Sequence, residues 1–259
     1  MSSPINATTD KSGLRYYEYN GQRLLSATSL RRVLGMSFGL HNWAVNQTIE
    51  ASLSMRGNIA ASAMTDDEYK KHLRKTSMTK RDEAASLGTS VHEAAELGVK
   101  ANDLGAKDVR KPFLLQFEAA QREIGFQVVA SEMQVFNLSL GYAGSLDAIM
   151  RMPDGTFVLT DYKTGKGIYN DTALQLALYF GAEFAGGFDV QDNKDVEYPH
   201  LTDLLNQCQS TAILHLRPDA WEWVPIPITD ELAAAAVDLT RMAHWFIKHP
   251  TLDTLKGSL

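Results

Sequence analysis

Residues 156–163, TFVLTDYK, determine the fold class and locate the chemistry of this chain. The segment follows the turn sequence PDG at residues 153–155 and is rich in β-branched and aromatic residues, so it predicts a β-strand. Because side chains alternate along a strand, Asp161 and Lys163 share a face with two apolar residues that precede them. The strand therefore places a carboxylate and an ammonium group together at its C-terminal end.

The preceding segment, residues 142–152, predicts a second strand that pairs with the first through this turn. A turn centred on residue 154 places Asp147 opposite Asp161, where two carboxylates can share one cation and would otherwise repel each other. A solvated strand end is the alternative interpretation of the Asp-x-Lys sequence. That alternative is weakened because Asp161 follows an apolar run, where an unpaired charge is costly.

These residue types suit metal-assisted hydrolysis of a phosphodiester. Asp161 would hold a hydrated divalent cation, and Lys163 would position the attacking water or stabilise charge in the transition state. The Tyr162 side chain points to the other face, but its backbone carbonyl could face the cation. The strand end thus predicts both a cation site and a cationic side chain beside it.

A histidine on a predicted helix is a third candidate. His92 lies in LGTSVHEAAELG, and Glu96 follows four residues later on the same helix face. The zinc-protease pattern needs a second histidine at the position of Glu96, so that class is not indicated. Taken alone, His92 is better explained as a capped or partly buried structural histidine than as a ligand.

The C-terminal part alternates predicted strands and helices, which indicates an α/β sandwich with a mixed sheet. The predicted strands are residues 127–136, 142–152, 156–163, 211–216 and 221–226. The predicted helices are residues 171–184 and 230–248, with a polar loop or insertion over residues 189–201.

The N-terminal part predicts mostly helices after a hairpin around Asn20-Gly21. The predicted hairpin strands are residues 16–19 and 23–25. The predicted helices are residues 29–34, 41–54, 66–98 with a break at 77–79, and 112–125. We divide the chain into three regions. Residues 1–13 are a loose tail, residues 14–80 are a mostly helical region with a basic strip, and residues 81–259 are the core.

Composition excludes several classes of protein. The 259 residues are 44% hydrophobic and 22% charged, which is typical of a globular domain. Cys208 is the only cysteine, so neither a disulfide within the chain nor a four-cysteine metal or iron–sulfur site can form. No apolar run long enough to span a membrane is present, and residues 1–10 lack a signal core. We therefore expect a reducing, cytoplasmic location.

The net charge of −6 argues mildly against a nucleic-acid partner. A local strip of cations would suffice, however, and residues 70–81 contain six basic residues and no acidic one. A solvated helix is the alternative interpretation of this strip. The candidate contacts to a DNA backbone are Lys70, Lys71, Arg74, Lys75, Lys80 and Arg81.

With these residues assembled, the chain resembles the RecB-like branch of the PD-(D/E)XK nuclease superfamily. The resemblance covers residues 88–179 and rests on four motifs in order. They are G-x-x-x-H-x-x-x-E at Gly88, His92 and Glu96; the strand YAGSLD ending at Asp147; D-Y-K-T-G at Asp161 to Gly165; and Q-x-x-x-Y at Gln175 and Tyr179.

The resemblance implies a restriction-endonuclease-like core, with a mixed central sheet flanked by helices, and a helical N-terminal region. It implies an Mg²⁺ or Mn²⁺ site, and an imidazole ligand favours Mn²⁺. The implied metal ligands are His92, Asp147, Asp161 and the Tyr162 carbonyl, with Asp147, Asp161 and Lys163 catalytic. Gln175 and Tyr179 would face the substrate strand, while Glu132 and Glu96 would have supporting roles.

The single cysteine sets this chain apart from relatives that carry an iron–sulfur cluster, and likens it to the cluster-free phage-type exonucleases. The implied function is a metal-dependent DNA exonuclease that acts on single strands or DNA ends, in the replication, recombination or repair of a phage or mobile element. The implied partners are DNA and replication or recombination proteins in the cytoplasm of a bacterial host, without a membrane. A catalytically silent DNA-binding module, an endonuclease and a hydrolase of another phosphoester stay open, as do cleavage polarity and oligomeric state.

Overall fold

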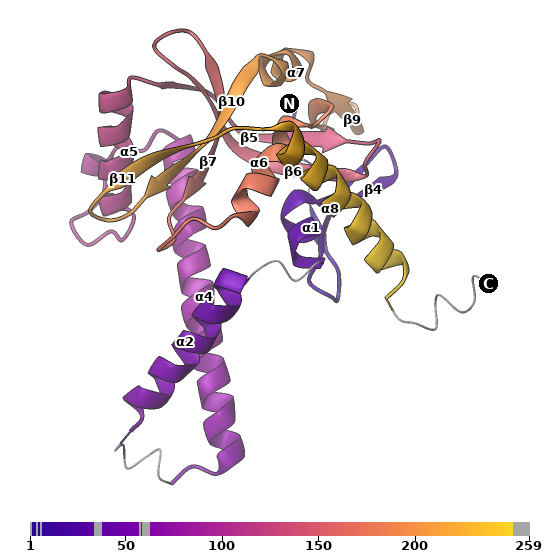
Figure 1. The fold of residues 1–259 in the computed structure, drawn as a ribbon. Coiled ribbons are helices and arrows are strands. Elements are labelled where there is room, and N and C mark those ends of the chain that lie inside the picture. The colour runs from indigo at the N-terminus through magenta and orange to yellow at the C-terminus, as the bar shows by residue number, and fades with distance from the viewer. Residues whose placement is uncertain are drawn as a thin grey trace.

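The computed structural model describes residues 2–3, 5, 7–33, 38–56, 58 and 63–250. Within these ranges it shows a mixed β-sheet with helices on both faces and a helical hairpin that extends away from the sheet (Figure 1). The predicted α/β class, a mixed central sheet flanked by helices, is therefore confirmed. None of the helices in the described ranges is long and apolar enough to cross a membrane.

The centre of the sheet is the predicted antiparallel meander. Its strands are β5 (Gln127–Asn137), β6 (Tyr142–Arg151) and β7 (Phe157–Lys163). The chain turns between β6 and β7 at Gly155, whose φ of 89° favours glycine. The last pair of the β6–β7 ladder is Ala148 with Thr160. One further step along this register brings position 147 opposite position 161, as the turn predicts.

The sheet extends on both sides of the meander. β7 pairs in parallel with β10, which pairs with β11, while β6 pairs in parallel with β4 of the N-terminal hairpin. On the far side, β5 pairs with β8, and β8 also pairs with β1 and β9. These strands are β1 (Ser2–Ser3), β2 (Thr8–Thr9), β3 (Arg15–Tyr19), β4 (Gln22–Ser26), β8 (Phe184–Asp189), β9 (Lys194–Glu197), β10 (Cys208–Leu216) and β11 (Trp221–Ile226).

Two helical layers cover the sheet, because residues on successive strand positions point to opposite faces. Ile149 and Leu159 pack into one core with α1, α6, α7 and α8, whereas Ala148 and Met150 pack into another with α4 and α5. Fully burying each large apolar side chain contributes roughly 1.5–3 kcal/mol to stability. These helices are α1 (Ala27–Val33), α4 (Asp66–Glu96), α5 (Lys111–Ile124), α6 (Asp171–Phe180), α7 (Pro199–Asn206) and α8 (Asp230–Lys248).

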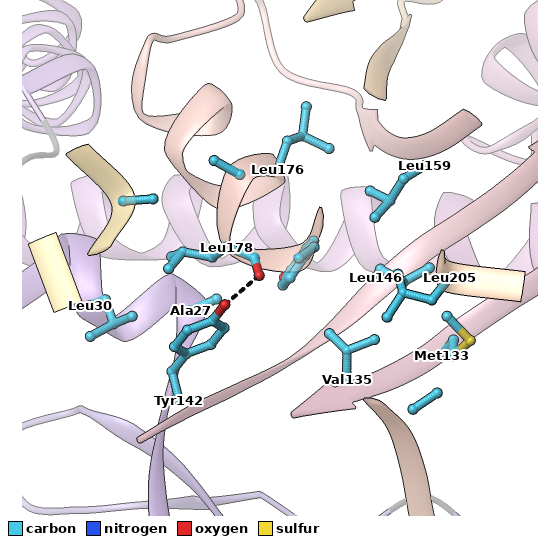
Figure 2. Packing of buried hydrophobic residues seen from close by; sticks show 14 of the residues in the cluster. Ala27, Leu30, Met133, Val135, Tyr142, Leu146, Leu159, Leu176, Leu178 and Leu205 are labelled. Carbon is cyan, nitrogen blue, oxygen red and sulfur yellow. Dashed lines mark hydrogen bonds between the residues drawn. The ribbon is translucent and has the colours of Figure 1, made fainter. Parts of the chain in front are cut away.

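A polar contact inside the first core fixes α6 on the sheet. The Tyr142 hydroxyl of β6 donates a hydrogen bond to the Leu178 carbonyl at 2.7 Å, and Leu30 packs beside them (Figure 2). Burial raises the pKa of the Tyr142 hydroxyl, so it stays protonated and remains a donor. The contact sets the position of the α6 residues that reach the candidate site.

Two predictions about the segment after α6 are wrong. The predicted helix extends to residue 184, but α6 ends at Phe180 and residues 184–189 form β8. Residues 189–201 are not simply a loop, because they contain β9 and the start of α7. The two adjacent glycines of β8 favour a loop when only the sequence is considered. A side chain at Gly187 would overlap the Tyr198 hydroxyl, so close packing, rather than a loop, requires glycine there.

The N-terminal segment predicted as a loose tail joins the sheet instead. β1 pairs with β8 and β2 pairs with β3. Between them, the buried Ile5 exchanges two hydrogen bonds with the Gln134 side chain, of 2.6 and 2.8 Å. A short polar sequence carries no local signal for such pairing, since its partners lie far away along the chain.

The helical hairpin consists of α2 (Phe38–Ser54) and the long α4 (Figure 1). The predicted break at residues 77–79 is wrong, because α4 is continuous through them. Hydroxyl residues disfavour a helix only weakly, and Thr76 donates to the His72 carbonyl one turn earlier, at 3.0 Å, without leaving the helix. The domain boundary proposed at residue 80 lies within this helix.

Candidate metal centre

The candidate site forms where the partners of β6 change. β4 pairs with the start of β6 as far as Ala143, and β7 pairs with its end from Ala148 onward. Between these points one edge of β6 is open, and Asp147 lies there. Its Oδ2 accepts a hydrogen bond from the backbone amide of Tyr162 at 2.6 Å. The β6–β7 ladder has ended at this point, so the Asp147 carboxylate, rather than a backbone carbonyl of β6, accepts the Tyr162 amide.

α4 brings His92 to the same carboxylate. His92 Nδ1 lies 3.6 Å from Asp147 Oδ2, and its ring meets the Tyr162 ring edge-on at 5.6 Å. One turn earlier, a Cβ at Gly88 would lie 3.0 Å from the Thr164 hydroxyl oxygen, so the glycine lets α4 approach the end of β7. The helix motif and the strand motif are therefore in contact.

Glu132 completes a group of three potential ligands. In β5, Met133 pairs with Leu146 and Ser131 pairs with Ala148, so Glu132 lies opposite Asp147. Its φ of 46° is in the left-handed region, which costs a non-glycine residue roughly 1–3 kcal/mol and is often found at functional sites. Ligand atoms of His92, Glu132 and Asp147 all lie within 4.8 Å of one another.

Asp161 and Lys163 are adjacent to this group at the end of β7. Asp161 is almost completely buried, and its Oδ2 has no hydrogen-bond partner apart from an ion pair with the Lys163 ammonium group. Lys163 Nζ also donates to the Tyr162 carbonyl oxygen at 3.4 Å. The ammonium group therefore contacts both β7 oxygens that the sequence predicts as cation ligands.

The α6 residues Gln175 and Tyr179 lie behind Asp161. Gln175 Nε2 donates to Asp161 Oδ1 at 3.3 Å and to the Tyr179 hydroxyl at 2.9 Å. Both side chains are buried, which leaves them little surface for a substrate strand. A Cβ at Gly144 would overlap the Tyr179 ring, so the glycine of the β6 motif makes room for the tyrosine of the α6 motif.

The charges of the site shift one another's pKa values. Burial lowers the pKa of His92, but the Asp147 hydrogen bond and charge outweigh it, so the pKa is raised. The same interaction with His92 overcomes burial at Asp147 and lowers its pKa. Burial raises the pKa of Asp161 against the opposing charge of Lys163, and the Asp147 charge adds to the rise.

Glu132 shows the same crowding of negative charge. Withdrawal of its carboxyl group from water raises its pKa, and the charge of Asp147 raises it further. Ser145 donates a hydrogen bond to its Oε2 at 3.0 Å. A divalent cation bound by these carboxylates and the imidazole would offset the repulsion between the negative charges. Mg²⁺ prefers the carboxylate oxygens, whereas Mn²⁺ also accepts the imidazole nitrogen.

Comparisons with known proteins give little. No protein-family model matches the chain, and no curated protein does. Among 23 matching chains of solved structures is one described as "Crystal structure of SSO0001". It is similar over 54% of this chain and 62% of its own length, at 17% identity and a TM-score of 0.29. The match thus spans less than two thirds of that protein, and a likeness this weak carries no argument about fold or function.

The other residues that the sequence predicts for the site are Glu96 and the basic strip of residues 70–81, and they lie on different parts of α4. Glu96 is exposed on α4, and its charge helps to raise the pKa of Glu132, whereas the contact that orients His92 comes from Asp147. The basic strip lies on α4 well away from the carboxylates (Figure 1). In the strip, Lys70, Lys71, Arg74 and Lys75 are exposed, while the side chains of Lys80 and Arg81 lie outside the described residues.

One buried residue near the site was missed in the sequence. His215 of β10 lies beside Lys163 in the parallel register, and its Nε2 lies 2.7 Å from the Gly165 carbonyl oxygen. Because that partner is an acceptor, Nε2 carries the proton. His215 thereby holds the segment that follows the lysine. The histidine lies in an apolar strand with no motif around it, so only the pairing of β7 with β10 reveals it.

Proposed function

We propose that this chain is an Mg²⁺- or Mn²⁺-dependent deoxyribonuclease of the RecB-like branch of the PD-(D/E)XK superfamily, with a restriction-endonuclease-like core. In this proposal it is an exonuclease that hydrolyses phosphodiester bonds in single strands or at DNA ends, in phage or mobile-element replication, recombination or repair. The observation that carries the proposal is the convergence of Asp147, Asp161 and Lys163 on two neighbouring strands, with His92 against Asp147.

His92, Asp147 and Asp161 would hold the cation, together with the Tyr162 carbonyl, and Glu132 stands close enough to add a further carboxylate. A divalent cation at this position supplies charge stabilisation for the phosphate oxygens and lowers the pKa of water. Gln175 fixes the orientation of the Asp161 carboxylate through its hydrogen bond.

Lys163 has two contacts that a bound cation would change, one with Asp161 and one with the Tyr162 carbonyl oxygen. Without the cation its ammonium group neutralises Asp161. Once a cation takes over that charge, the ammonium group can turn to the phosphate, where it would orient the attacking water or stabilise the developing negative charge. In this scheme Lys163 is the residue that touches the reacting atoms.

The decisive experiment is incubation of the purified protein with an end-labelled DNA oligonucleotide in the presence of Mg²⁺, Mn²⁺ or EDTA. We expect cleavage only with a cation. Removing the ammonium group in Lys163→Ala, or one charge in Asp161→Asn, should reduce the rate at least about 100-fold, as loss of a transition-state contact does. The exposed Lys248 at the end of α8 provides the matched control, and Lys248→Ala should cleave at the rate of the unaltered chain.

Each alternative function predicts a different result of that experiment. Tight binding without any product would indicate a silent DNA-binding module, and cutting of a closed circular strand would indicate an endonuclease. Hydrolysis of a small phosphodiester but not of DNA would indicate another phosphoester as substrate. Undiminished cleavage by Lys163→Ala would contradict the site assignment.

A further inference from the structure

α4 carries two features at opposite ends of one helix. Its last turns carry His92, which contacts Asp147, and its first turns carry four basic residues. All four basic side chains are exposed, and they are Lys70, Lys71, Arg74 and Lys75. The basic strip and the candidate metal centre are therefore joined by a continuous rigid element.

The basic residues and His92 also lie on one side of α4. At about 100° per residue, Lys70, Arg74, Lys71 and Lys75 span an arc of roughly 140°, and His92 falls inside that arc. The opposite side of the same turns faces α2, since the Tyr69 hydroxyl lies 2.9 Å from the Ser52 hydroxyl. The hairpin thus buries one side of α4 and presents the cationic side to solvent.

The acidic neighbours of the strip pair with only part of it. Glu68 accepts the Thr65 backbone amide in a capping box, and its pKa is lowered by that bond. Asp67 lies 3.5 Å from Lys70 in an ion pair that is exposed to solvent. No ion pair of Lys71, Arg74 or Lys75 is found within the described residues. A shallow hollow beside Met64 is lined by Glu68 as well as by Lys71, His72 and Lys75.

The spacing between the two features suits a DNA backbone. With a rise of 1.5 Å per residue, the strip lies about 26–33 Å along the helix from His92. Along the axis of a DNA duplex each strand carries a phosphate about every 3.4 Å, so in a duplex the interval corresponds to roughly eight to ten phosphates. The hairpin extends away from the body, and among the described elements only α2 lies beside the first turns of α4 (Figure 1).

We propose that the α2–α4 hairpin is a second DNA-binding element, which holds the phosphate backbone of the uncut portion of the substrate about 26–33 Å from the cleavage site. This inference rests on the proposed nuclease function. Lys71, Arg74 and Lys75 contact phosphate oxygens, and α4 sets the distance between these contacts and the metal centre. Long substrates gain affinity from the hairpin, whereas a trinucleotide reaches only the metal centre.

The test uses a triple variant, Lys71→Gln with Arg74→Gln and Lys75→Gln. Its control removes three exposed charges elsewhere, in Lys107→Gln with Arg122→Gln and Lys248→Gln, and circular dichroism confirms that both variants are folded. Binding of a labelled 30-nucleotide strand is measured by anisotropy in EDTA over a salt series. We expect the hairpin variant to bind at least about tenfold more weakly, and its slope of log affinity against log salt to fall by about 2. The control variant keeps both values.

Cleavage assays with Mn²⁺ separate this inference from the proposed function. The hairpin variant should cleave a trinucleotide at the unaltered rate and lose kcat/KM only on the 30-nucleotide strand. Equal losses on both substrates, or equal binding losses in the control variant, would overturn the hairpin as a separate element. If the unaltered chain binds the long strand through the hairpin but cuts neither substrate, the nuclease function fails, and the hairpin is a DNA-binding element without a cleavage site.

Discussion

Oδ2 of Asp147 accepts the backbone amide of Tyr162 at 2.6 Å and lies 3.6 Å from Nδ1 of His92. A single carboxylate oxygen therefore joins β6, the end of β7 and α4. The contact is structural as well as chemical, because it satisfies an amide at the point where β7 leaves β6. Substitutions at Asp147 can separate these two roles.

Asp147→Asn keeps an oxygen for the Tyr162 amide but removes the charge. We expect nearly unchanged stability together with a loss of metal affinity of about 10–100-fold or more. Asp147→Leu leaves the amide without a partner, at a cost of about 1–3 kcal/mol in the free energy of unfolding. Urea unfolding and metal titration measure the two quantities. Equal stability of the two variants would contradict the structural role.

Metal binding should be measurable without any substrate. A cation that binds only the folded state at 100 times its Kd stabilises it by about 2.7 kcal/mol, and each kcal/mol raises the Tm of a chain this size by about 2–4 °C. We expect Mn²⁺ to raise the Tm of the unaltered chain, and the rise to disappear in His92→Ala. The exposed histidine variant His200→Ala should keep the full shift. An identical shift in all three proteins would place the cation elsewhere.

Gly144→Ala should disrupt the contact between β6 and α6. The new Cβ overlaps the Tyr179 ring, which is buried and cannot move freely, so the expected destabilisation is about 1–3 kcal/mol. The matched control is Gly105→Ala, where a Cβ meets no atom within 4 Å. Combining Gly144→Ala with Tyr179→Leu should restore part of the loss in a double-mutant cycle. Simple additivity of the two changes would argue against the clash.

His215→Phe should displace the segment that follows Lys163 while leaving the metal ligands in place. A small misplacement of a catalytic group can lower a rate by about 100-fold. We therefore expect kcat to fall with little change in KM or in the Mn²⁺-induced rise of Tm, and His215→Gln, which keeps a donor, to recover part of the rate. A loss of the Tm rise would instead assign His215 to metal binding.

The Asp108–Arg110 pair predicts an acid dependence of stability at the start of α5. Hydrogen bonds from the Arg110 side chain and backbone lower the pKa of Asp108 to about 2. Because the pKa is depressed in the folded state, the stabilisation is present above the unfolded value near 3.8 and is lost as pH falls towards 2.

Asp108→Asn should therefore be less stable than the unaltered chain at pH 5, and the difference should shrink as the pH falls below 4. Urea unfolding at several pH values measures it. Asp103→Asn, on an exposed carboxylate of the short helical turn before α5, should show no comparable difference. A difference at pH 5 that persisted down to pH 2 would rule out the ion pair as its source.

The sequence determined what depends on neighbouring residues. The PDG turn between two strands, together with the alternation of side chains along a strand, predicts position 147 opposite position 161. The register of β6 and β7 agrees with this prediction. The bounds predicted for α8 are those observed, since Thr229 caps it and its apolar face is regular. The sequence also found His92, because Gly88 and His92 lie one turn apart on a single helix.

Only the tertiary structure decided what depends on contacts between distant segments. Glu132, to which the resemblance gave only a supporting role, lies within 4.8 Å of ligand atoms of His92 and Asp147, and no local pattern predicts its left-handed φ. Gln175 proved to be buried against Asp161, and residues 184–189 became a strand by pairing with β5 and β9. Such pairings depend on residues tens of positions away, so local sequence cannot specify them. Asp161 and Lys163 of β7 thus lie beside Asp147 of β6 and His92 of α4, and the basic residues at the other end of α4 belong to the helical hairpin.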